Sequence, residues 1–142
     1  MKLNETINEP EQLNALALAY MGDGVLDMYV RFRLISQGQV RPNKLHKEAT
    51  KYVSAKSQAR VLQKLMDNGD LTDVEISVVK RGRNAKSGTI PKNTDHATYR
   101  YSTAYEALIG YLYLTGNEQR MDEIVAKSFL MIERKEEDHG GK

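Results

Sequence analysis

Residues 16–27 read LALAYMGDGVLD, an apolar stretch with helical spacing that carries Asp23 between two glycines. An ionised carboxylate in a core is unfavourable unless it is neutralised or finds a partner. A second acid, Glu106, lies in a similar apolar setting, in the sequence YEALIGYL that begins at Tyr105. If both helices pack in the core, the two carboxylates converge, and a divalent cation would stabilise both ionised forms. We therefore expect Asp23 and Glu106 to form a metal site of the Mg²⁺ type. The alternative is structural, with Asp23 as a capping or salt-bridged residue and Glu106 on a helix surface, paired with a Lys or Arg.

The composition excludes several other kinds of site. The 142 residues fit one domain, and the chain has no Cys, which excludes disulfides and thiolate zinc sites. The three histidines are scattered, so a histidine-rich metal site is not expected. No apolar run reaches the length of a membrane span, and the N-terminus has no signal-peptide pattern. A cytoplasmic protein without a membrane partner is the expectation.

Apolar residues recur at helical spacing almost throughout, which predicts an all-α, single-domain fold. One domain is expected over residues 1–132, followed by a charged flexible tail over 133–142. Residues 82–97 are rich in turn formers and predict a loop. Gly38 is expected to end the long first helix. Helices are expected to begin near Pro10, Pro42, Ser54, Thr72 and Thr98, with Thr72 and Glu75 forming a capping box.

Positive charge is concentrated in one segment, although the net charge is only +2. Residues 80–100 hold six basic side chains and one acid, Asp95. This segment is either a footprint for phosphates or a solvated loop that keeps the protein soluble. Arg81 is either an RNA contact or a structural residue, and Arg100 has the same two alternatives. The candidates for RNA contact are Arg81, Arg83, Asn84, Lys86, Ser87, Lys92 and Asn93.

Three motifs resemble those of a known family. Residues 20–27 resemble the signature of the ribonuclease III catalytic domain, and residues 105–110 resemble its second acidic motif. Residues 81–88 and 91–95 resemble a loop of the short variety, Mini-ribonuclease III, which lacks an appended double-stranded-RNA-binding domain. The three motifs occur in the family's order and spacing, over about residues 13–114.

The resemblance implies a homodimeric endoribonuclease that hydrolyses double-stranded RNA, leaving 5′-phosphate and 3′-hydroxyl ends. It implies Mg²⁺ as cofactor, Asp23 and Glu106 as metal ligands and catalytic residues, and precursor 23S ribosomal RNA as substrate, with a ribosomal protein as a further candidate partner. The apolar helix around Asp23 fits either a dimer interface or a monomer core. The interface is expected to use Val25, Leu26, Tyr29 and Val30.

Two positions depart from the family pattern. The family carries acids four residues before the first motif Asp and three before the second-motif Glu, where this chain has Ala19 and Thr103. Supplementary candidates for the metal site are Asp27, Asp95 and Thr103. The missing acids motivate a rival hypothesis, a non-catalytic RNA-binding helical module. A weaker third alternative is a ribosome-assembly adaptor that docks protein partners.

Overall fold

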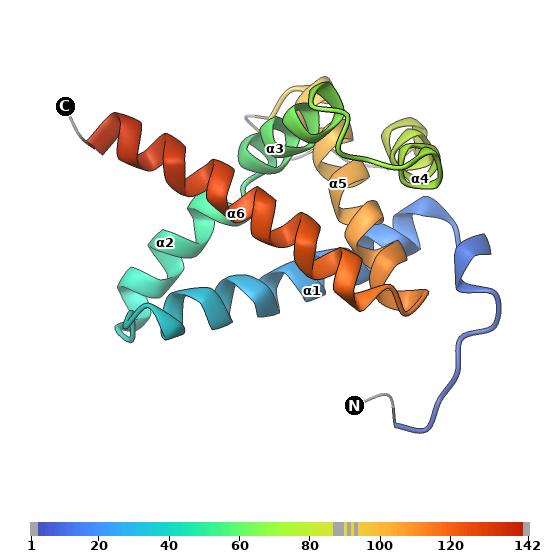
Figure 1. Cartoon of the computed structure of the whole chain (residues 1–142), viewed down its shortest axis with the longest axis horizontal. Helices are drawn as coiled ribbons and strands as arrows, with labels where there is room; N and C mark the ends of the chain where they lie inside the picture. Colours follow the sequence, from blue (N-terminus) through green and yellow to red (C-terminus); the bar gives the residue numbers. More distant parts are fainter. Residues whose placement is uncertain (1–2, 87–89, 91, 93, 141–142) are drawn as a thin grey trace.

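Helices make up nearly all of the described chain, which confirms the all-α prediction (Figure 1). The structure is a computed structural model that describes residues 3–86, 90, 92 and 94–140, with the backbone alone for 136–140. Within these ranges there is no strand. Nor does any helix there combine the length and apolarity needed to cross a membrane. The elements are η1 (Pro10–Gln12), α1 (Ala15–Ser36), α2 (Pro42–Val53), α3 (Ala55–Asp67), α4 (Asp73–Asn84), α5 (His96–Leu114) and α6 (Glu118–Gly140).

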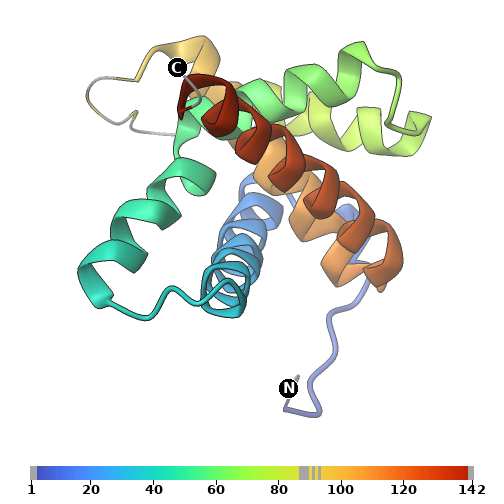
Figure 2. The same ribbon diagram turned by 60° about the vertical axis from the view of Figure 1, so that its left-hand side comes forward.

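Helix α5 is the centre of the molecule. It contacts α1, α3, α4 and α6, and α6 passes across α1 and α5 on one face (Figures 1 and 2). Its residues Ala104, Leu108 and Ile109 are fully buried, because neighbours cover this helix from several sides. Burial of apolar surface on this scale is the main source of stability for a domain of this size. Anything carried on α5 is therefore held by most of the fold.

Helices α1 and α5 cross in backbone contact at Gly22 and Gly110. A Cβ atom added to Gly22 would lie 1.8 Å from the carbonyl oxygen of Glu106. One added to Gly110 would lie 1.9 Å from the carbonyl oxygen of Leu18. No side chain fits at either position, so glycine is required for this approach. Because Gly22 precedes Asp23 in sequence, the crossing fixes Asp23 close to Glu106.

Local signals locate most helix ends correctly. Ser54 accepts a hydrogen bond from the Ser57 backbone N–H at 3.2 Å, as expected of an N-cap, and the Thr72–Glu75 capping box is formed. Helix α1 ends at Ser36, two residues before Gly38. The expected start of α5 at Thr98 was wrong. Asp95 caps this helix instead, and its side chain accepts a hydrogen bond from the Thr98 backbone N–H at 2.8 Å. The short acidic side chain of Asp95 thus takes the N-cap position that was expected for the Thr98 hydroxyl.

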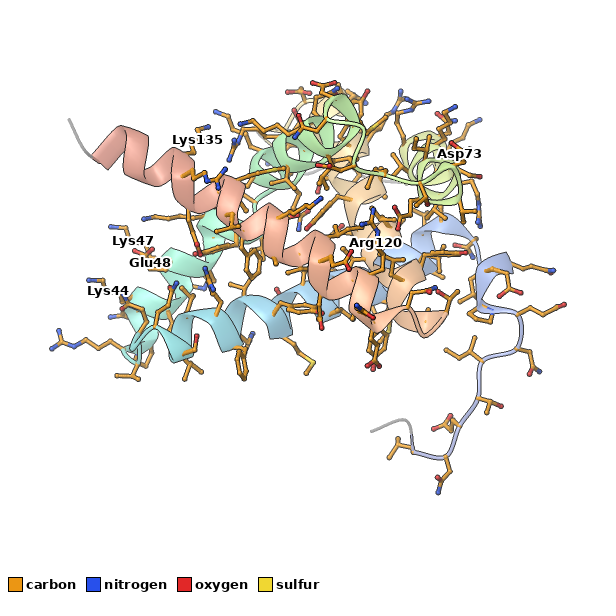
Figure 3. The ribbon with its side chains drawn as sticks, in the orientation of Figure 1. Lys44, Lys47, Glu48, Asp73, Arg120 and Lys135 are labelled. Carbon is orange, nitrogen blue, oxygen red and sulfur yellow. The ribbon has the colours of Figure 1, made fainter. Side chains whose placement is uncertain are left out.

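Two polar clusters attach α6 to the rest of the fold. Arg120, labelled in Figure 3, pairs with the buried Glu75 of α4 at 2.8 Å. Nearer the C-terminus, Glu133 pairs with Arg33 of α1 at 2.7 Å and accepts a hydrogen bond from the Tyr52 hydroxyl at 2.8 Å. Helix α6 thus continues into the residues expected to form a tail, and Glu133 binds two other helices.

Candidate active site

Asp23 and Glu106 lie within hydrogen-bonding reach of each other, one on α1 and one on α5. The expectation that the two carboxylates converge is met. The expected burial of Asp23 is not, because its side chain is exposed, whereas Glu106 is half-buried. The cause is the rotation of α1 about its own axis. Leu18, Gly22 and Leu26 face the core, and Asp23 lies at the edge of that face. The pair therefore opens to solvent from the α1 side.

Glu106 is electrostatically destabilised as an anion. Burial is the main cause that raises its pKa, followed by hydrogen bonding to Asp23 and by the charges of Asp23 and Asp27, and together they bring it to about 9. Asp27 responds in the same way. Partial burial and then the charge of Asp23 raise its pKa, while Arg31 opposes the shift. The site thus gathers three acidic side chains, of which Asp27 is partly compensated by Arg31.

A buried amide adjoins the pair, and the sequence analysis missed it. Gln58 of α3 is 2% exposed, and its Oε1 accepts a hydrogen bond from the Ser102 hydroxyl at 2.7 Å. Its side chain lies close enough to Glu106 to lower the pKa of that carboxyl group. The signal was present in the sequence. Gln58 shares an apolar stripe with Leu62 and Leu65, where a polar residue is out of place.

The three supplementary candidates differ in position. Asp27 lies near the pair, and the charge of Asp23 contributes to its raised pKa. Thr103 is buried one turn from Glu106, and its hydroxyl donates to the Tyr99 carbonyl at 3.0 Å. Asp95 is not brought to the site, because it caps α5 about 16 Å along the axis from Glu106. The pKa of Asp95 is lowered by the Thr98 hydrogen bonds.

The donor set at this site suits a hard cation with few protein ligands. No group of three or more His, Cys, Asp or Glu that could hold a metal occurs among the described residues. Two adjacent carboxylates remain, with Asp27 nearby. Mg²⁺ is bound in this manner, by one or two carboxylates, with waters and substrate phosphates as the other ligands. The residues present therefore fit Mg²⁺, and the repulsion between the carboxylates is what a cation would relieve.

The basic segment divides into structural and free side chains. Arg81 donates to the backbone carbonyls of Glu11 and Leu13, which is the structural alternative for this residue. Arg83 is half-buried, and Asn84 and Lys86, at the end of α4, are exposed, as is Lys92. Ser87 and Asn93 lie outside the described residues.

A cavity of about 450 Å³ lies between the end of α4 and the first turns of α5. Lys86 and Asn84 line it, and so does Thr103, which is one turn from Glu106. Two further residues line it that were not among the RNA-contact candidates, His96 and Arg100. Arg100 is exposed, and no hydrogen bond or ion pair engages it within the described ranges. The cavity thus extends from the basic segment to the turn of α5 that precedes Glu106, and neither Asp23 nor Glu106 is among its lining residues.

An exposed apolar face runs along α1 beside the pair. Its members Tyr20, Met28, Phe32 and Ile35 are 85%, 62%, 77% and 56% exposed. Two of them, Met28 and Phe32, line a groove of about 620 Å³ between α1 and the start of α6. Of the expected interface residues, Val25 and Tyr29 line this groove, whereas Leu26 and Val30 are buried in the protein's own core. Val25 is itself buried, although it lies on the same face of the helix as Met28 and Phe32.

Comparison with known proteins agrees with these features. The family model for the Ribonuclease III domain matches residues 16–117. Mini-ribonuclease 3 of Brevibacillus brevis is 52% identical over 133 residues, which cover 94% of this chain and 98% of the relative. Mini-ribonuclease 3 of Staphylococcus aureus is 50% identical, over 91% of this chain and 96% of the relative. A crystal structure of a protein from Fusobacterium nucleatum matches with a TM-score of 0.75 at 27% identity, covering 87% of this chain and 95% of the other.

Enzymes of the matched family are generally metal-dependent, act on double-stranded RNA and are typically dimeric. The matched region contains both acids of the site and the Gly22–Gly110 crossing that brings them together. Its identity to the relatives extends over nearly the whole chain. The chain therefore belongs to the ribonuclease III family, in its Mini-ribonuclease III group, and is an endoribonuclease.

Proposed function

We propose that this protein is a Mg²⁺-dependent endoribonuclease that hydrolyses double-stranded RNA with Asp23 and Glu106 as its metal ligands and catalytic residues. The convergence of these two carboxylates at the glycine crossing of α1 and α5 carries the proposal. Family membership supports the reaction class. The rival hypothesis of a non-catalytic module loses its motive, because Mg²⁺ sites commonly use only two carboxylates and complete the shell with water and phosphate.

Asp23, Glu106 and the metal ion that they would hold contribute differently to the proposed reaction. When bound, Mg²⁺ would lower the pKa of a water and offset negative charge on the phosphate and on the leaving 3′-oxygen. Asp23, which is exposed, would be accessible to the RNA phosphate, and Glu106 is half-buried on the central helix α5. Glu106 must lose its proton to serve as a ligand, so cation binding releases that proton. Hydrolysis would then leave 5′-phosphate and 3′-hydroxyl ends.

We infer that RNA contacts the end of α4 and the loop after it. Exposed Lys86 and Lys92 would bind phosphates, and half-buried Arg83 a third, while the Asn84 amide would bond a sugar hydroxyl. Ser87 and Asn93 remain candidates on sequence alone. Arg81 is removed from this set because its guanidinium is engaged by backbone carbonyls. These contacts would position the duplex with little dependence on base sequence.

The biological assignment rests on the group. We propose precursor 23S ribosomal RNA as the substrate, a homodimer as the active form, a ribosomal protein as a candidate partner and the cytoplasm as the location. We further propose that the catalytic domain extends through Glu133, since this residue pairs with Arg33 and Tyr52. The dimer is proposed to bury the exposed apolar face of α1, which lies beside the carboxylate pair.

Neutralising one ligand tests the proposal. Asp23→Asn keeps the shape of the side chain and removes its charge, so cleavage of a long RNA duplex in Mg²⁺ should be abolished while duplex binding persists. Asp73→Asn, at an exposed acid that begins α4 (Figure 3), is the matched control and should cut normally. Cleavage by Asp23→Asn within about tenfold of wild type, or about 1.4 kcal/mol of barrier, would exclude Asp23 as a catalytic ligand.

A further inference from the structure

One donor in the core has no partner. The Gln58 side chain is 2% exposed, and its Nε2 atom makes no hydrogen bond with any described residue. A buried donor left unsatisfied is unfavourable, and an apolar residue of similar length would avoid the loss. Gln58 lies in α3 on a stripe with the fully buried Leu62 and Leu65, and although its oxygen has a partner in Ser102, no described residue accounts for its N–H groups. The amide therefore needs another explanation.

The orientation of this amide is fixed from one side. The Ser102 hydroxyl donates to Gln58 Oε1 at 2.7 Å, and Ser102 is itself buried. With its oxygen held there, the amide directs Nε2 away from Ser102, toward the carboxylate of Glu106. Ser102 and Glu106 lie four residues apart on α5 and so share a face. Ser102 and Glu106, both on α5, thus lie on either side of the Gln58 amide of α3.

The unsatisfied N–H group of Gln58 points toward Glu106, which is a proposed metal ligand. A carboxylate ligand of a metal is commonly held by a hydrogen bond from a second group, which fixes its orientation and tunes its affinity. An amide N–H can do this without adding charge to a site that already holds two acids. It is suited to a chain with Ala19 and Thr103 where the family carries further acids, because fewer ligands must each be held more firmly.

We propose that Gln58 is a positioning residue for the metal ligand Glu106, with its amide N–H group donating to the Glu106 carboxylate and Ser102 fixing the amide. This inference rests on the proposed function. It adds a residue that does not touch the metal or the RNA and that acts through Glu106.

Substitution by an apolar residue of equal length separates positioning from packing. Gln58→Met removes the amide and fills the same space, and Gln63→Met, at an exposed position of the same helix, is the matched control. Mn²⁺ alone serves as the probe, with its binding measured by calorimetry and by its paramagnetic resonance signal. We expect Gln58→Met to weaken Mn²⁺ binding about tenfold or more and to lower kcat, with affinity for duplex RNA unchanged.

Thermal unfolding without metal gives the second readout. Gln58→Met removes an unsatisfied buried donor but also the acceptor of the Ser102 hydroxyl, and these two effects oppose each other, so its melting temperature should stay close to that of wild type. A structural role predicts the reverse, a lower melting temperature with unchanged Mn²⁺ affinity and kcat, and that result would overturn the inference. If Gln58→Met does not fold, Ser102→Ala decides, because it keeps the amide but frees its orientation. Weakened Mn²⁺ binding in Ser102→Ala supports positioning, and wild-type binding refutes it.

Measurements on the wild-type protein separate a failure of the proposed function from a failure of the role proposed for Gln58. If wild type neither binds Mn²⁺ nor cuts duplex RNA, the proposed metal-dependent function itself is wrong. If wild type does both and Gln58→Met behaves as Gln63→Met does, only the role of Gln58 is wrong.

Discussion

Glu106 carries an electrostatic conflict that a partner of opposite charge would resolve. Burial, Asp23 and Asp27 raise its pKa to about 9, so the metal-free protein holds this carboxyl protonated at neutral pH. A raised folded-state pKa means that the folded form binds the proton more tightly than the unfolded form. The associated stability is complete below about pH 4.5 and is lost as the pH rises toward 9. Function at this residue therefore opposes stability.

Removing the carboxyl group should reveal this conflict. We expect Glu106→Gln to unfold at higher urea concentration than wild type at pH 8 without metal, and the difference to shrink as the pH falls toward 5. One pKa unit corresponds to about 1.4 kcal/mol, so a fraction of the shift is measurable. Glu11→Gln, at an exposed acid, is the control and should show no such trend. A Glu106→Gln protein that is less stable than wild type at pH 8 would contradict the account.

Helix α4 and the loop after it combine two kinds of basic side chain. Arg81 is bound to the carbonyls of Glu11 and Leu13 and so connects α4 to the segment before α1. Lys86 and Lys92 are exposed, and neither makes a hydrogen bond or ion pair with the described part of the chain. Both kinds carry the same charge, so charge alone does not separate attachment of the N-terminal segment from contact with RNA.

Alanine substitution should separate these roles. Lys86→Ala with Lys92→Ala should lower the slope of log affinity against log salt by somewhat under one unit per lost phosphate contact, with stability unchanged. Arg81→Ala should lower stability by about 1 kcal/mol, since its hydrogen bonds are lost, and should leave that slope nearly as it is. Filter binding over a salt series and urea unfolding measure the two effects. An unchanged slope in the double variant would make the loop a solvated surface.

At the scale of the whole molecule, the exposed face of α1 needs a partner. Met28 and Phe32 lie in the open beside a groove of about 620 Å³, and a contiguous apolar surface of this kind marks an interface. Because the proposed Asp23–Glu106 site would act on one strand at a time, cutting both strands in one encounter would require two sites held at a fixed distance. A two-fold dimer through α1 would provide them.

A charge on this face should dissociate the dimer. Wild type should sediment at twice the 16.1 kDa chain mass, and Phe32→Asp at the chain mass, with double-strand cuts lost or replaced by nicks. Val74→Asp places the same charge on an exposed apolar residue of α4 and should remain dimeric. Mixed dimers of wild-type and Asp23→Asn subunits should nick one strand. Double-strand cutting in one encounter by a monomeric protein would refute the dimer proposal.

The sequence by itself predicted the helices and several of their caps, and it singled out the two acids that the fold brings together. These features depend on interactions within a few residues, such as the Ser54 cap and the Thr72–Glu75 box, so local chemistry is sufficient. The order and spacing of the motifs around Asp23 and Glu106 also identified the family.

Only the tertiary structure decided which way each helix faces. Residues 16–35 are apolar around most of the helix, so their spacing could not tell the core face, with Leu18 and Leu26, from the exposed face, with Met28 and Phe32. Packing of α1 on α5 through Gly22 selects the rotation, and with it the exposure of Asp23. The amide of Gln58 meets Glu106 across a distance of 48 residues in sequence because α3 packs on α5. Contacts of this kind depend on the whole fold, so no local pattern contains them.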